Sequence, residues 1–139
     1  MERMTAKITK AFFDSKGFHV DQVGDEGEVL LAGFAMNNRE GIRVIIQFDD
    51  NEESAKILAP EVAKIPENAM DKMYKVINDI NEHYRWIKFV IDEENNTVMA
   101  GDDAVIQLDS CGEEIFRCCF QLVHIVDQAY PEIMKAIFS

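Results

Sequence analysis

The sequence predicts an α+β protein in which helices pack on an antiparallel β-sheet. Two observations predict this class. Apolar residues alternate with polar ones in several segments, the period of a half-buried strand, and recur every three or four residues in others, the period of an amphipathic helix. The strand-like segments follow one another across short polar turns, as antiparallel strands do. Residues 1–139 are read as a single domain.

The first helix is predicted from about residue 5 to residue 16. Met4, Ile8 and Phe12 recur there at helical spacing, and Gly17 readily takes the left-handed conformation in which helices end. Two strands then fit residues 18–36, one on each side of the polar turn at residues 24–27.

The clearest strand is residues 42–48, where apolar and polar residues alternate after a linker of turn-forming residues. A further alternating segment, residues 55–59, is predicted to end at Pro60, because proline cannot donate a hydrogen bond to a central ladder. Three consecutive antiparallel strands with short turns make a meander. The predicted order of the whole chain is therefore α-β-β-β-α-β-β-α.

The second helix is predicted to begin at Pro66 and Glu67, and it has one narrow apolar stripe. The stripe consists of Met70, Met73, Ile77, Ile80 and Tyr84. A hairpin follows, with strands at residues 86–92 and 98–106, because the two central asparagines between them suit a tight turn. Gly101 marks a bulge in the second of these strands.

The last helix is predicted from Ser110 to at least Gln128. Ser110 and Glu113 have the spacing of a capping box, and Pro131 is expected to kink or restart the helix. Its apolar residues fall in two stripes. The first is Ile115, Cys118, Leu122, Ile125 and Ala129, and the second is Phe116, Cys119, Phe120, Val123 and Tyr130.

A helix that is apolar over most of its circumference must be covered on more than one side. The sheet covers one side. The second stripe is then covered either by a second copy of the protein, which makes it a homodimer interface, or by the tail folded back after Pro131.

The chain has 26 acidic and 14 basic residues, a formal charge of −12. This charge opposes nucleic-acid binding, because affinity for a polyanion comes largely from Lys and Arg. The acidity either maintains solubility or steers a basic partner to the surface. The sequence has no stretch of about 18 apolar residues that would predict a membrane span. Three cysteines, and no apolar signal region behind Met1, favour free thiols in the cytoplasm.

The histidines and cysteines form no metal-binding pattern. His19, His83 and His124 lie far apart, and none has a second ligand at a spacing that one element would allow. Cys118 and Cys119 point about a hundred degrees apart on a helix. With Cys111 they are interpreted as small buried hydrophobic residues.

The acidic turn at residues 49–53 fails the test of a calcium loop, which needs Gly at its sixth position and Glu at its twelfth. Counting from Asp49, Ser54 and Pro60 stand there. Nucleophile motifs and glycine-rich phosphate loops are also missing. We therefore expect a protein that is not an enzyme and has no cofactor or metal. The alternative is a small-molecule or metal-binding protein or enzyme that uses acidic turn residues and His83 or His124 in a cleft between the sheet and the second helix.

The element order resembles that of the YbjN-like bacterial family, whose members are described as sensory transduction regulators and look like type III secretion chaperones in fold. The residues that carry the resemblance are Val76–Asn81 at the end of the second helix, Arg85–Phe89 and Asp92–Val98. It spans the chain from about Thr5 to Ile137.

The resemblance implies a small, acidic, cytoplasmic homodimer that binds a polypeptide, chaperone-like or regulatory, and catalyses nothing. In secretion chaperones the bound segment adds to a sheet edge and fills apolar grooves. The residues expected to form such a surface here are Leu31, Ile45, Leu58 and Trp86, which lie on the strand face opposite the better-defined core face. If helices cover both faces, all four are core instead. Asn78 and Asn81 are expected to cap the end of their helix.

Overall fold

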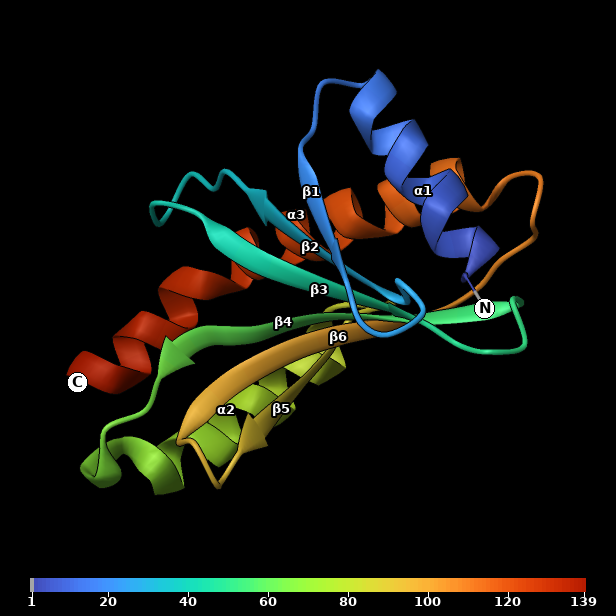
Figure 1. Ribbon diagram of the computed structural model, residues 1–139. Helices are drawn as coiled ribbons and strands as arrows, with labels where there is room; N and C mark the ends of the chain where they lie inside the picture. The colour runs from blue at the N-terminus through green and yellow to red at the C-terminus, as the bar shows by residue number, and fades with distance from the viewer. Residues whose placement is uncertain (1) are drawn as a thin grey trace.

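The alternating segments form one antiparallel sheet of six strands, and three α-helices pack against it (Figure 1). The structure, a computed structural model, describes residues 2–139. Its elements are α1 (Met4–Ser15), β1 (Val20–Val23), β2 (Val29–Phe34), β3 (Ile42–Phe48), β4 (Ser54–Lys64), the short 3-10 helix η1 (Glu67–Ala69), α2 (Met70–His83), β5 (Lys88–Asp92), β6 (Thr97–Val105) and α3 (Cys111–Phe138). The strands lie in the order β1-β2-β3-β4-β6-β5. The predicted α+β class is confirmed.

Four strands precede α2, one more than the predicted order contains. The additional strand is β1, in which Val20 pairs with Ala32 and Val23 with Val29. The observed order is α-β-β-β-β-α-β-β-α. β1 and β2 are the two strands predicted on either side of the turn at residues 24–27, so these segments are confirmed and the predicted order counted one strand too few.

β4 continues through Pro60, where the sequence predicted its end. The proline is tolerated because the β3–β4 pairing stops at Ile45 and Leu58. No backbone N–H is therefore needed at Pro60 to bond β3. The β4–β6 register also shifts between Ala59 and Ala63. The bulge therefore lies in β4.

One face of the sheet carries the core. The side chains that point to this face are buried and alternate along each strand, and they include Leu30, Phe34, Val44, Ile46, Phe48, Ile57, Ala59, Phe89, Val98 and Ala100. α1 contacts β1 and β2, α2 contacts β5, and α3 contacts β4 and β6. In Figure 1, β1 crosses in front of α3 and β6 crosses in front of α2. The three helices therefore cover one face of the sheet.

α3 runs through Pro131 to Phe138 as one helix, so it does not restart there and the tail does not fold back. Proline lacks the N–H that would bond the carbonyl four residues earlier, that of Asp127. The Nδ2 atom of Asn38 donates to this oxygen instead, at 2.9 Å. The Asp127 carboxylate in turn accepts the backbone N–H groups of Asn37 and Asn38, each at 2.9 Å. The β2–β3 loop thus satisfies the helix at the position where the proline interrupts it.

The predicted capping box at Ser110 and Glu113 does not form. Ser110 has φ −130° and ψ 4°, away from the extended backbone of a capping serine. Its Oγ donates to Glu114 Oε1 at 3.1 Å, and the same oxygen accepts the N–H of Gln107 at 3.0 Å. Glu114 thus bonds the Ser110 side chain, while the Ser110 N–H donates to the carbonyl of Gln107 at 3.1 Å.

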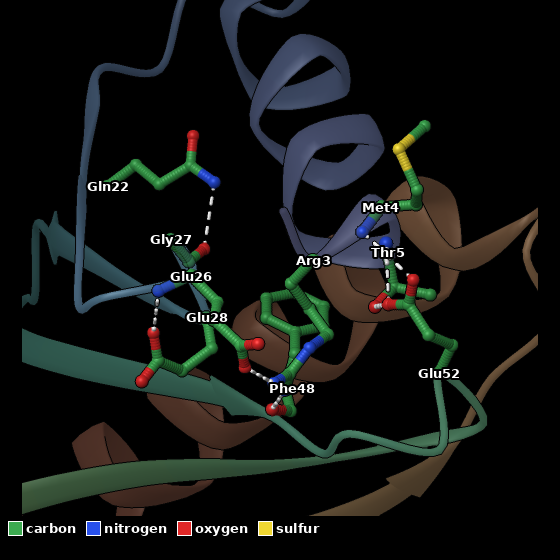
Figure 2. A network of polar contacts seen from close by, with 9 residues as sticks. All are labelled: Arg3, Met4, Thr5, Gln22, Glu26, Gly27, Glu28, Phe48 and Glu52. Atoms are coloured by element: carbon green, nitrogen blue, oxygen red, sulfur yellow. Dashed lines mark hydrogen bonds and ion pairs between the residues drawn. The ribbon is translucent and has the colours of Figure 1, made fainter. Parts of the chain in front are cut away.

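The start of α1 is held by side chains from two distant turns (Figure 2). Arg3 is buried and donates to the carbonyl of Phe48 and to the carboxylate of Glu26. Glu52 accepts the N–H of Met4 at 2.9 Å and the N–H and hydroxyl of Thr5 at 3.1 and 2.7 Å. The two N–H groups are among the backbone donors that a helix leaves unpaired in its first turn. The acidic turn at residues 49–53 therefore caps a helix.

Candidate functional site

The face of the sheet away from the helices, called here the open face, carries a row of three large apolar residues. Leu31 of β2 stands opposite Ile45 of β3, and Ile45 stands opposite Leu58 of β4. All three are half-buried. The sequence proposed these residues for a partner surface one by one, and the strand register brings them into a single line. The open face is uncovered in the part of the chain that the structure describes, so it is not a second core.

The row continues to both edges of the sheet. Asp21 of β1 stands opposite Leu31, Gly101 of β6 stands opposite Leu58, and Lys88 of β5 stands opposite Gly101. Gly101 is regularly paired, so it does not form the predicted bulge. Gly101 and Leu58 line the same depression, and Leu58 Cδ1 lies 3.4 Å from where a Cβ of Gly101 would stand. The row therefore has an acid at one end, a base at the other and apolar residues between.

Trp86, the fourth predicted partner residue, stands beside this depression. Its side chain is 66% exposed, and its backbone has φ +74°, in the left-handed region that non-glycine residues avoid. Ile87, the next residue, is buried and points to the core. The Arg85 guanidinium lies 5.0 Å from the centre of the Trp86 ring. An exposed tryptophan in a costly backbone conformation points to a role outside the fold itself.

A hollow of about 400 Å³ joins Trp86 to the row. Its lining is Lys56, Leu58, Trp86, Lys88, Val90, Met99, Gly101, Asp102 and Asp103. Val90 and Met99 stand opposite each other, one row further along the strands than Gly101. Sequence reasoning missed Met99, Gly101 and Lys88, because their place on the open face depends on the β5–β6 register.

The centre of the open face is nearly neutral, although the chain carries −12. The apolar row and its two neighbouring rows hold three basic residues, Arg43, Lys56 and Lys88, and two acidic ones, Asp21 and Asp103. Lys56 and Asp103 stand directly opposite each other. The excess of acidic residues therefore lies elsewhere, and the acidity does not select what binds at this face.

The outer edge of β5 is occupied by a side chain of α2. Asn81 Nδ2 donates to the carbonyl of Phe89 at 2.8 Å, and the Phe89 N–H donates to Asn81 Oδ1 at 2.7 Å. Asn81 therefore pairs with a strand, whereas the sequence predicted a cap for its own helix. Asn78 is exposed. Since Asn81 takes both backbone groups of Phe89, a peptide cannot add to β5 there.

The second stripe of α3, predicted as a homodimer interface, is covered largely by the protein's own aromatic residues. Cys119 is fully buried and Val123 nearly so. The ring of Phe116 packs edge-on against the rings of Phe13 and Phe18, with centroids 5.1 and 5.4 Å apart. Further ring pairs join it to Phe12 and Phe120. Phe120 is 42% exposed, and Phe116 and Tyr130 are half-buried. Only part of the surface of this stripe is therefore free to contact a second copy of the protein.

The candidate residues for chemistry are not brought together. His19, His83 and His124 are exposed on separate elements, and the side of α2 that faces the sheet is filled by apolar residues. Burial raises the pKa of all three thiols, Cys111, Cys118 and Cys119, most strongly for Cys119. Among residues 2–139, no group of three histidine, cysteine or acidic side chains is placed to hold a metal ion.

A family model matches residues 10–135, and its family is described as "putative bacterial sensory transduction regulator". The chain belongs to the YbjN family. The resemblance of its element order to that family is thus confirmed over almost the whole chain. No curated protein that was compared with the chain matches it.

Three solved structures share the fold of this YbjN-family chain. YbjN from E. coli aligns with a TM-score of 0.62 at 13% identity, over 88% of this chain and 89% of that one. A chain of the ExoU–SpcU complex from the type III secretion system of Pseudomonas aeruginosa aligns with 0.55 at 12% identity, over 88% and 95%. A chain of the ExsC–ExsE complex aligns with 0.50 at 15% identity, over 93% and 92%. The predicted likeness to secretion chaperones in fold is confirmed.

Over residues 2–139, the helices of this YbjN-family chain are too short or too polar to cross a bilayer.

Proposed function

We propose that this YbjN-family chain is a non-enzymatic protein-binding module, chaperone-like or regulatory, that holds a polypeptide segment of a partner on its open face. The observation that carries the proposal is the apolar row Leu31–Ile45–Leu58 beside the Trp86 hollow, on a sheet face without a helix. Exposed apolar surface of this kind marks sites of protein association. The fold supports the same role, because two of its structural neighbours come from complexes of two proteins.

The chemistry of the open face favours association over catalysis. An active site gathers titratable groups whose pKa values are tuned by their neighbours. The centre of this face instead gathers Leu31, Ile45, Leu58, Val90 and Met99, with charged residues around them. Such a surface takes up apolar side chains of a partner.

The mode of binding follows from which part of the sheet is available. Asn81 closes the middle of the β5 edge, so we propose that the partner packs its side chains on the open face rather than adding a strand to β5. Because the face is nearly neutral, the apolar contacts carry the affinity, and the complex withstands salt better than one held by charge.

Free thiols in the described chain agree with a reducing compartment, and we place the protein in the cytoplasm. We propose no metal, cofactor or nucleic acid as a partner.

The experiment is capture of the tagged protein from its native host at 0.15 M and at about 0.5 M NaCl, where surface charges are strongly screened, followed by mass spectrometry. We expect a stoichiometric polypeptide with the wild-type protein at both salt concentrations. Trp86→Gly, which removes the exposed ring but suits the positive φ, should lose this polypeptide. Leu108→Ala is the matched control, because Leu108 is half-exposed but lies outside the sheet.

Equal recovery of the polypeptide by all three proteins would reject the open face as the binding surface. Recovery of each protein alone would reject the binding module.

A further inference from the structure

We propose that, when no partner is bound, the open face is covered by a second copy of this chain, the two sheets packing face to face about a two-fold axis that runs parallel to the strands between β3 and β4. The inference rests on the proposed function in one respect: the polypeptide partner and the second copy use the same face, so they compete for it. Four features of the open face carry the inference.

The first feature is the symmetry of the row. It takes one residue from each of the six strands, with two strands on either side of the β3–β4 pair. A two-fold axis parallel to the strands reverses the order of strands across the face. β3 of one copy then faces β4 of the other, β2 faces β6, and β1 faces β5. An interface of this kind is self-complementary, as closed dimers require.

The second feature is the match of side chains at the centre of the row. Ile45 of one copy lies over Leu58 of the second, and the rotation repeats this contact on the other side of the axis. Sheets that pack face to face lie about 10 Å apart, with their inner side chains interdigitated. Four half-buried aliphatic side chains thereby make the dry centre of the interface.

The third feature is that each large residue beside the centre faces a glycine. Leu31 in β2 lies over Gly101 in β6 of the second copy, where the sheet is depressed. One row further along, Met99 in β6 lies over Gly33 in β2. The space where a Cβ of Gly33 would stand is open, with nothing within 4 Å. Gly33 thus leaves open space for Met99. At Gly101 the place of a Cβ lies 3.4 Å from Leu58 Cδ1 of the same chain, so Leu31 packs on Gly101 and Leu58 together.

The fourth feature is the charge at the ends of the row. The rotation sets Asp21 at the β1 end over Lys88 at the β5 end of the second copy, twice in each dimer. The other in-plane axis, along the row, would set Asp21 on Asp21 and Lys88 on Lys88. Asp21 Oδ1 also lies 3.0 Å from His19 Nε2 in its own chain, and both residues are exposed. Charge therefore selects the axis parallel to the strands.

Net charge also favours this face over the others. Two copies that each carry −12 repel one another through any surface with the average composition of the chain. The repulsion is smallest where the surface is nearly neutral, which is the centre of the open face. At its margin, the exposed Val23 lies in the row of Lys56 and Asp103, two residues that line the same hollow as Trp86.

The test is the mass of the untagged full chain by light scattering over a wide range of concentrations, for the wild type, Asp21→Lys and Lys88→Asp. We expect a reversible wild-type dimer. Each variant alone places like charges at both ends of its interface, which should weaken the dimer by about tenfold or more. An equimolar mixture of the two variants restores both contacts, one reversed and one native. The mixture should therefore form a dimer at concentrations where each variant alone is a monomer.

A dimer in the mixture also shows that both variants are folded, because only folded chains can pair. Loss of the dimer in each variant alone therefore cannot be put down to unfolding. A wild-type protein that stays monomeric at every concentration overturns the inference. A dimer that is unchanged in both variants, or a mixture that stays monomeric, also overturns it.

Competition is measured with the polypeptide identified by capture, added to the wild-type dimer. A complex with one copy of this chain supports the shared face, and a complex with the dimer intact overturns it. If the protein proves to be a monomer, capture of the polypeptide and its dependence on Trp86 can still be observed. If no polypeptide is captured, the charge-swap experiment can still show a dimer. The two failures are therefore distinguishable.

Discussion

The side chain of Asn38 donates a hydrogen bond to the carbonyl oxygen of Asp127, the atom that Pro131 leaves without a donor in α3. This contact joins the loop between β2 and β3 to the last helix. Asn38→Ala should destabilise the protein by about 1 kcal/mol, because the carbonyl loses its donor. In a Pro131→Ala background, the new N–H bonds Asp127 and the same change should cost less. Urea unfolding of the four proteins measures the coupling, and equal costs in both backgrounds would contradict the assignment.

The pairing of Asn81 with Phe89 gives a second prediction. Asn81→Ala leaves the N–H and carbonyl of Phe89 without their partner, so we expect a loss of about 1–3 kcal/mol in unfolding free energy. The amide hydrogen of Phe89 should also exchange faster with solvent. Asn78→Ala, one turn earlier on the same helix and exposed, is the matched control. Equal effects of the two substitutions would show that Asn81 acts only through helix propensity.

Trp86 should be replaceable without cost to the fold. In the left-handed region a non-glycine residue costs roughly 1–2 kcal/mol, which glycine avoids. Trp86→Gly should therefore unfold with a free energy higher than that of Trp86→Ala by about 1 kcal/mol, the reverse of the usual order of the two residues. Thermal unfolding of monomeric protein checks this. A less stable glycine variant would mean that the tryptophan serves the fold.

Gly112 allows α3 to approach α1. A Cβ at this position would stand 2.6 Å from the Cβ of Phe12, closer than such atoms pack. Gly112→Ala should therefore cost about 1–3 kcal/mol, although the same change in a free helix would stabilise it. Glu113→Ala, at the exposed next residue, should change stability by less than about 0.5 kcal/mol. A stabilising Gly112→Ala would show that the helices separate at little cost.

Acid should weaken the hydrogen bonds that the carboxylates of Glu52 and Asp127 accept from backbone N–H groups. Burial by itself raises the pKa of Glu52 and of Asp127, but the hydrogen bonds from Thr5 and Met4, and from Asn37 and Asn38, outweigh it and lower both. A carboxyl group whose pKa is lowered in the folded state contributes its full stabilisation to the folded protein when the pH is above the pKa of that group in the unfolded chain. This stability is lost as the pH falls from the unfolded pKa through the lowered folded pKa.

The urea midpoint of the wild type should therefore drop between pH 5 and pH 3. The drop should be smaller in Glu52→Gln, which has already lost the charged contact, while Glu53→Gln serves as the neighbouring control. A drop of the same size in Glu52→Gln would show that Glu52 does not contribute to acid sensitivity.

The sequence predicted the class, most of the elements and the faces of the strands, because these depend on short-range periodicity. The alternation at residues 42–48 marks β3 by itself, and the stripe through Met73, Ile77 and Ile80 marks the buried side of α2. Leu31, Ile45, Leu58 and Trp86 were assigned to the open face by the same alternation. Nothing in that alternation says that three of them share a row, because the row depends on how β2, β3 and β4 are aligned.

Tertiary contacts decided the rest. Pro60 and Pro131 stop an isolated strand or helix, and here each is accommodated by a neighbour: the end of the β3–β4 ladder and the side chain of Asn38. The second stripe of α3 is apolar in any context, and aromatic residues from α1 and β2 cover most of it. A local pattern determines which side of an element is apolar, and only the packing of distant segments determines what meets that side.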